Sequence, residues 1–117
     1  MRLNEISFDM GKPVDGYGPG FFRIGGEKVE GAVAVFPDGV HPWGGLDDHA
    51  TLLDRAGQVD VIFVGMGAAI AHPPAELRAA LEAAGLGFEV MASDAACRTY
   101  NVLLAEGRRV GLALLPV

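Results

Sequence analysis

The second half of the chain alternates apolar runs with helical patterns, and this alternation restricts the fold more than any other feature of the sequence. Apolar runs that favour strands occupy residues 59–64, 87–91 and 109–115, and segments with helical patterns at 75–85 and 94–105 separate them. The first of these helical segments follows two prolines and ends at a glycine, which are common helix boundaries. Strands and helices that alternate at such short spacing predict successive right-handed crossovers, and therefore an α/β fold with a largely parallel sheet.

The N-terminal part of the chain has a different pattern. Residues 1–20 are rich in glycine and proline, so we expect an irregular segment with at most one short strand near residues 2–8. Two apolar runs, at 21–24 and 29–36, flank a bend that contains two glycines. This arrangement predicts a β-hairpin that extends or flanks the sheet.

A turn-rich passage connects the hairpin to the second half. It leads into residues 47–56, where the leucines of a short amphipathic helix and two candidate N-cap residues, Asp47 and Asp48, occur. A carboxylate at the N-cap accepts hydrogen bonds from the first free N–H groups of a helix. We therefore expect a short helix here, before the first strand of the alternating half.

Length and composition restrict the class of protein. The chain has 117 residues, which is a common size for one domain, so we expect a single domain over residues 1–117. The formal net charge of −6 provides no electrostatic attraction to nucleic acid or anionic lipid. A single cysteine cannot form an internal disulfide, the first residues do not resemble a secretory signal, and no apolar run approaches the ~20 residues of a membrane span. These features predict a soluble, cytoplasmic protein.

One edge of the predicted sheet is the expected place for a ligand pocket. The carboxyl ends of parallel strands meet at the same edge, so the loop after residues 59–64 should lie beside the start of the helix that follows residues 87–91. The candidate pocket residues are Gly65, Met66, Gly67, Ser93, Asp94, Cys97 and Arg98.

Cys97 is the most reactive residue type in this set. With Ser93 or Asp94 as N-cap, Cys97 would lie in the first helical turn, where the helix dipole and the Arg98 charge would lower the pKa of its thiol. In a Cys–His pair, Cys97 would be the nucleophile and His72 the base that activates it. The alternative is that Cys97 is a small packed residue, with the Asp94 charge opposing its ionisation.

Evidence for other chemistry is weak. The turn Gly65–Met66–Gly67 has glycines that allow a phosphate near the backbone, but it lacks the third glycine of a dinucleotide motif and the lysine of a Walker motif. The three histidines have no spacing typical of metal ligands. We therefore expect no catalytic residue set, no metal and no cofactor.

Three aromatic residues lie in loops or at strand ends near glycines. Tyr17, Phe21 and Trp43 would present apolar surface to a partner protein. Alternatively, these rings cover the open end of the core.

Residues 91–115, M-A-S-D-A-A-C-R-T-Y-N-V-L-L-A-E-G-R-R-V-G-L-A-L-L, closely resemble the signature of domain-of-unknown-function family 498. Other segments that resemble this family occur in the same order as in its members: Y-G-P-G-F-F-R-I at 17–24, a strand that ends in V-F-P at Pro37, a loop with Trp43, and P-P-A-E-L-R at 73–78. Met66 departs from the pattern, because threonine is expected in this turn.

The resemblance implies a compact three-layer α/β domain with a mixed central sheet, which is consistent with the β-α-β-α-β C-terminal half and the N-terminal hairpin that the segment pattern predicts. The family comprises small archaeal and bacterial proteins without an assigned activity, and its eukaryotic relative is a mitochondrial complex I assembly factor. The resemblance therefore implies a non-enzymatic module that binds protein partners during assembly of a respiratory complex.

Two functions from different classes follow. A binding or assembly module would expose apolar side chains around Tyr17, Phe21 and Trp43. A small-molecule-binding or thiol-redox protein would instead use Cys97 and Arg98 beside the loop 65–73, with the sulfur accessible. An open hairpin or edge strand would in addition favour homo-oligomers. The incomplete catalytic set favours a non-enzymatic role and leaves enzymatic activity open.

Overall fold

The computed structural model describes residues 11–117, and the strand expected near residues 2–8 lies outside this range. The strands are β1 (Val14–Gly18), β2 (Phe21–Ile24), β3 (Glu27–Glu30), β4 (Val33–Phe36), β5 (Gly39–Pro42), β6 (Val61–Met66), β7 (Gly87–Met91) and β8 (Val110–Leu115). The helices are α1 (His49–Leu53), α2 (Ala75–Ala83) and α3 (Ser93–Ala105), with a short 3-10 helix at Ala56–Gln58.

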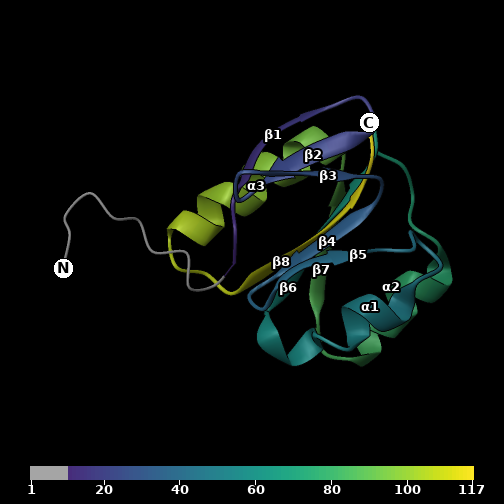
Figure 1. Ribbon diagram of the computed structural model, residues 1–117. Coiled ribbons are helices and arrows are strands. Elements are labelled where there is room, and N and C mark those ends of the chain that lie inside the picture. The colour runs from purple at the N-terminus through teal and green to yellow at the C-terminus, as the bar shows by residue number, and fades with distance from the viewer. Residues whose placement is uncertain (1–10) are drawn as a thin grey trace.

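The described residues form three layers (Figure 1). The middle layer is a five-stranded sheet with the order β5-β4-β8-β6-β7. Strand β6 is parallel to β7 and β8, whereas β4 is antiparallel to β8 and β5. Helices α1 and α2 cover one face of this sheet, and α3 covers the other face together with a three-stranded sheet of order β1-β2-β3. The α/β class, the mixed central sheet and the alternating C-terminal half are therefore confirmed.

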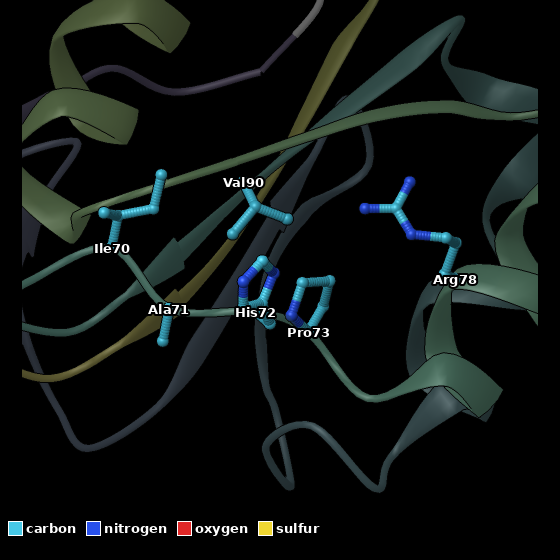
Figure 2. Close-up of a pocket in the computed structure, with 6 residues that line it drawn as sticks. All are labelled: Ile70, Ala71, His72, Pro73, Arg78 and Val90. Atoms are coloured by element: carbon cyan, nitrogen blue, oxygen red, sulfur yellow. The ribbon is translucent and has the colours of Figure 1, made fainter.

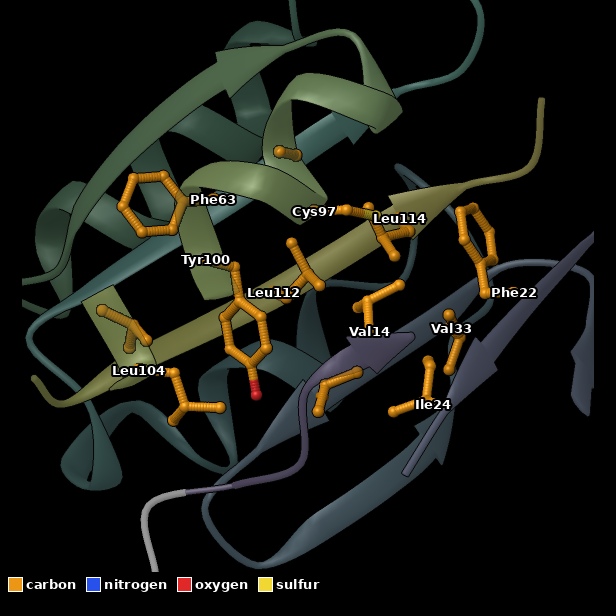
Figure 3. Packing of buried hydrophobic residues seen from close by; sticks show 13 residues of the cluster. Val14, Phe22, Ile24, Val33, Phe63, Cys97, Tyr100, Leu104, Leu112 and Leu114 are labelled. Atoms are coloured by element: carbon orange, nitrogen blue, oxygen red, sulfur yellow. The ribbon is translucent and has the colours of Figure 1, made fainter. Parts of the chain in front are cut away.

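The two central strands of the alternating half are buried on both faces, which explains their continuous apolar sequences. In β6 and β8 the inner residues are all buried. Alternate side chains enter two separate cores. The core against α3 and the small sheet contains Phe22, Phe63, Tyr100, Leu112 and Leu114 (Figure 3), and the core against α1 and α2 contains Ile62, Val64, Leu77, Leu81 and Ala113.

The N-terminal hairpin is shorter than its sequence pattern predicts. Strands β2 and β3 form it around Gly25 and Gly26, whose φ angles of +58° and +85° suit a tight two-residue turn between twisted strands. The predicted run 29–36 is not one strand. It divides at Gly31, which has a φ of +81°, and the part after this residue becomes β4 and joins the central sheet beside β8.

Three further expectations for the first half of the chain need correction. Part of the segment expected to be irregular forms β1, which pairs with β2 in an interrupted register. Strand β5 was not predicted, although it pairs with β4 along its whole length. The helix expected over 47–56 divides into α1 and the 3-10 helix. Its predicted cap is confirmed, because the Asp48 carboxylate accepts a hydrogen bond from the Thr51 N–H at 3.2 Å.

Candidate functional site

The loop after β6 and the start of α3 lie side by side, as their places at the ends of parallel strands predict. The Gly67 N–H donates to Ser93 Oγ at 2.9 Å, and the Ser93 N–H donates to the Gly67 carbonyl at 2.8 Å. Ser93 Oγ in turn donates to the carbonyl of Leu115 at 2.7 Å. One hydroxyl therefore connects the ends of β6 and β8 to the first turn of α3.

The residues at this junction are tightly packed. Ser93 is fully buried, and a Cβ added at Gly65 would lie 2.7 Å from Ser93 Oγ and 2.8 Å from Ser93 Cα. The glycine therefore serves the close approach of α3 to β6, and not the approach of a phosphate. Met66 is partly buried and packs against the core on the α2 side. Neither of the two cavities described below is lined by Gly65, Gly67, Ser93 or Cys97.

Cys97 belongs to the core. Helix α3 begins at Ser93 with Ala92 at the N-cap position and no capping side chain, so Cys97 lies in the second turn and not the first. The residue is 3% exposed and lies beside Leu114 (Figure 3). Burial raises the pKa of its thiol to about 12; the Asp94 charge acts in the same direction and the Arg98 charge opposes it. The expectation of an accessible thiol with a lowered pKa is therefore wrong, and the packed alternative describes this residue.

Asp94 and Arg98 lie on the outer side of α3. The Asp94 Oδ2 and the Arg98 Nη1 are 3.5 Å apart, one helical turn from each other on an exposed surface. The other carboxylate oxygen accepts from the Ala95 N–H at 2.8 Å. Because exposed pairs of this kind contribute little to stability, this pair is a solvated feature of the helix.

The polar residues that follow Cys97 hold the first strand. Asn101 Nδ2 donates to the Val14 carbonyl at 2.8 Å, and the Val14 N–H donates to Asn101 Oδ1 at 2.9 Å. The Tyr100 hydroxyl donates to the Lys12 carbonyl at 2.9 Å, and burial raises the pKa of Tyr100. The side-chain amide of Asn101 thus pairs with β1 as a neighbouring strand would. The motif A-A-C-R-T-Y-N is consequently a docking element between α3 and the N-terminal strands.

The three aromatic candidates do not form one surface. Trp43 is 4% exposed, and its Nε1–H donates to the Asp48 carbonyl at 3.0 Å, so Trp43 covers the core and the expectation of an exposed ring is wrong. Tyr17 is 43% exposed. Phe21 is half-buried, with Lys28 Nζ 4.8 Å from its ring centroid. Because Tyr17 is paired with Phe22, the neighbour of Phe21, the two remaining aromatic rings project from opposite faces of the small sheet.

A cavity of about 390 Å³ lies between the loop after β6, strand β7 and helix α2, and the second half of the predicted loop 65–73 forms one of its walls. It is lined by Ile70, Ala71, His72, Pro73, Arg78 and Val90 (Figure 2). Figure 2 shows the guanidinium of Arg78 extending from α2 toward the side of Val90 and the His72 ring. The guanidinium carbon lies 4.8 Å from the centroid of the Phe88 ring, which supports the side chain in this position. The sequence predicts the loop 65–73 as a wall of the site and His72 as a possible base, but it does not predict that Arg78 and Val90 line the same cavity, because they lie on α2 and β7.

A second, shallower hollow of about 290 Å³ lies on α3. It is lined by Arg98, Thr99, Val102 and Leu103. Val102 is 58% exposed, and Ile70 at the first cavity is 68% exposed. Both hollows therefore combine an exposed aliphatic side chain with one arginine.

Within residues 11–117, no three His, Cys, Asp or Glu side chains are placed to share a metal ion. No helix of this range has the length and apolar sequence that a bilayer crossing requires.

The chain is similar in sequence and in structure to known proteins of bacteria and animals. A family model described as "Protein of unknown function (DUF498/DUF598)" matches residues 14–115. An uncharacterised protein of Rhodobacter capsulatus is 51% identical over 117 residues, which cover 100% of this chain and 94% of that protein. The NADH dehydrogenase (ubiquinone) 1 alpha subcomplex assembly factor 3 of Rattus norvegicus is 27% identical over 124 residues, which cover 99% of this chain and 66% of that protein. The crystal structure of an outer membrane protein from Bartonella henselae superimposes with a TM-score of 0.82 at 32% identity and covers 93% of this chain and 98% of that one.

Proposed function

We propose, from the premise that this chain belongs to the DUF498 family of proteins of unknown function, that it is a non-enzymatic module that binds protein partners during assembly of a respiratory NADH dehydrogenase. The observation that carries this proposal is the similarity to the rat assembly factor along 99% of the chain. The chain spans 66% of the length of that relative, so the proposal concerns the functions of the shared domain.

The surface of the domain supports a binding role. Large apolar side chains are exposed at Tyr17, Ile70 and Val102, on the small sheet, the loop after β6 and helix α3 respectively. Single apolar side chains are normal on a protein surface, but Ile70 and Val102 each line a hollow, and hollows with apolar walls are common binding sites. The buried position of Cys97 and its raised pKa provide no support for the thiol-redox alternative.

A deletion strain tests the assembly role. Removal of the gene should reduce the fully assembled NADH dehydrogenase on native gels and leave smaller subcomplexes that contain its subunits. The wild-type gene should restore the complete enzyme, and a different respiratory complex provides the internal control. Normal amounts of assembled enzyme in the deletion strain would contradict the proposal.

A second measurement identifies direct contacts. The tagged full chain, cross-linked in cells before lysis, should recover subunits of the same subcomplexes. Recovery that is equal for a tagged, unrelated acidic protein of similar size would mean that the contact is non-specific.

A further inference from the structure

Strand β7 forms an open edge of the central sheet. It pairs with β6 on one side and, in the part of the chain that the structure describes, with no strand on the other. The Gly87 N–H donates toward β6, to the Asp60 carbonyl at 3.2 Å. Because strand hydrogen bonding alternates along the backbone, the N–H groups of Phe88 and Val90 point away from β6. This edge therefore offers unpaired donors and acceptors to another extended chain.

The two hollows lie on either side of this edge. Val90 lines the 390 Å³ cavity and packs on the α2 side of the sheet. The next residue, Met91, packs on the α3 side, where its Sδ lies 3.7 Å from Oγ1 of Thr99, which lines the 290 Å³ hollow. An open strand edge with a hollow near it on each face of the sheet, one lined in part by Val90 and the other by α3 residues beside Met91, has the geometry of a strand-addition site.

We propose that β7 accepts an extended segment of a partner protein as an added strand, with one apolar side chain in each hollow. This inference rests on the proposed binding function and assigns it a surface. Because successive side chains of a strand point to opposite faces, the two apolar residues of the segment would occupy neighbouring positions. The backbone pairing would supply affinity, and the hollows would select the side chains.

The charges at the site specify the segment further. Arg78 lines one hollow and Arg98 the other, although the chain as a whole carries a net charge of −6. Among the described residues each arginine has one long ion pair on an exposed surface, at 3.8 Å for Arg78 and 3.5 Å for Arg98, and Arg78 also lies over the Phe88 ring. Both guanidinium groups can therefore turn toward a carboxylate. The partner segment should carry Asp or Glu close to its apolar pair, at positions that face Arg78 or Arg98 and not directly opposite Glu89, which is exposed in the middle of β7.

A second copy of this chain fits the edge less well. Glu89 is the middle residue of β7 and is exposed. In a symmetric antiparallel pairing centred on β7, Glu89 would lie opposite the same residue of the other copy, and like charges in this position are destabilising. The net charge of −6 on each copy adds to the repulsion.

A displayed library of random octapeptides, selected against the immobilised full chain, tests the proposal. Enriched peptides should share two adjacent apolar residues with Asp or Glu nearby. Each of the variants Ile70→Asp and Val102→Asp should weaken the binding of a synthetic enriched peptide by about tenfold or more, since each places a carboxylate in one hollow. The variant Tyr17→Asp is the matched control, because Tyr17 is an exposed apolar residue on a different sheet, and it should bind with unchanged Kd.

Amide hydrogen exchange distinguishes strand addition from simple occupation of the hollows. The bound peptide should slow exchange at Phe88 and Val90, whose N–H groups face outward, and circular dichroism of each variant verifies that the fold is intact. Absence of any enriched peptide, peptides that bind both variants normally, or unchanged exchange at these two amides would overturn the inference. A β7-mediated dimer of this chain that excludes the peptide would also overturn it. Impaired NADH dehydrogenase assembly in the deletion strain together with any of these results would leave the proposed function in place.

Discussion

The chemistry of a cysteine depends on its surroundings, and those of Cys97 oppose ionisation. The thiol is packed among aliphatic and aromatic residues between α3 and the central sheet. Neither the helix dipole nor the neighbouring Arg98 compensates for the loss of hydration, because Arg98 points to solvent and Cys97 lies one turn too deep in the helix. The same sequence neighbours would have a different effect on an exposed sulfur.

Alkylation of Cys97 should consequently be very slow in the folded protein. With a pKa of about 12, only a trace of the thiol is ionised near neutral pH. At about pH 8 the rate with iodoacetamide should be roughly three orders of magnitude below that of the same chain unfolded in urea, which is the control. Equal rates in the two states would show that the sulfur is accessible in solution.

The close contact at Gly65 also acts at the scale of a single residue. In Gly65→Ala the new methyl group would meet Leu114, the Ser93 hydroxyl and the Ser93 backbone at less than 3.0 Å. Since backbone cannot move aside easily, we expect a loss of about 2 kcal/mol or more in the free energy of unfolding, measured by urea denaturation.

Gly57→Ala is the matched control for this substitution. Gly57 has open space around the position of a Cβ and no positive φ. The free energy of unfolding of the Gly57→Ala variant should stay within about 0.5 kcal/mol of the wild-type value. If the two variants are equally stable, the tight packing of α3 on β6 is not maintained in solution.

At the scale of elements, α3 connects the two sheets. Its inner face packs on β6 and β8, and its Asn101 amide pairs with the backbone of β1. The small sheet is therefore attached to the central sheet through side-chain hydrogen bonds, the shared core and a backbone hydrogen bond from Gly20 to Val117, and not through a continuous strand ladder.

Asn101→Ala should loosen β1 without unfolding the central sheet. The substitution leaves the Val14 N–H and carbonyl without their partner, so the Val14 amide should exchange faster by about tenfold or more, while amides of β6 and β8 keep their protection. Arg98→Ala removes a surface side chain of the same helix and should leave the Val14 amide unchanged. A uniform rise in exchange across all strands would instead indicate global destabilisation.

For the molecule as a whole, the buried Cys97 thiol and Tyr100 hydroxyl predict a loss of stability at alkaline pH. Cys97 keeps its proton up to about pH 12 when folded, whereas its ordinary pKa is 9.0. Below both values the proton is bound in both states and has no effect on stability. Above 9.0 the unfolded chain releases the proton first, so the free energy of unfolding falls as the pH rises toward 12. Tyr100, whose pKa is also raised, acts in the same direction at higher pH.

Urea denaturation at several alkaline pH values measures this effect. Above the ordinary pKa of the thiol, Cys97 should contribute a decrease of about 1.4 kcal/mol per pH unit. Cys97→Ala should show a flatter dependence just above about pH 9, even though its absolute stability is lower. Parallel pH profiles for the two proteins would refute the contribution of the thiol.

The fold class and the succession of elements after Val59 follow from local sequence. Residues buried on both faces produce the continuous apolar runs of β6 and β8, and prolines and glycines bound α2, so each signal lies within a few neighbouring residues. The place where the loop after β6 meets the start of α3 also follows, because parallel strands end at one edge.

Tertiary structure alone decided the rest. Strands β1 and β5 have few residues of strand-like composition, and each forms against the strand next to it in the chain, β2 or β4. Strand β1 is held in addition by Asn101, which is far away in the sequence. Ser93 fills the space at the end of β6 where a ligand would bind, because α3 approaches Gly65 closely. The distance between these two elements cannot be predicted from a local sequence pattern. The burial of Cys97 and the hollows beside β7 likewise arise from packing between elements. Local sequence therefore determined the fold class and the order of the elements after Val59, and tertiary contacts determined which surfaces are open.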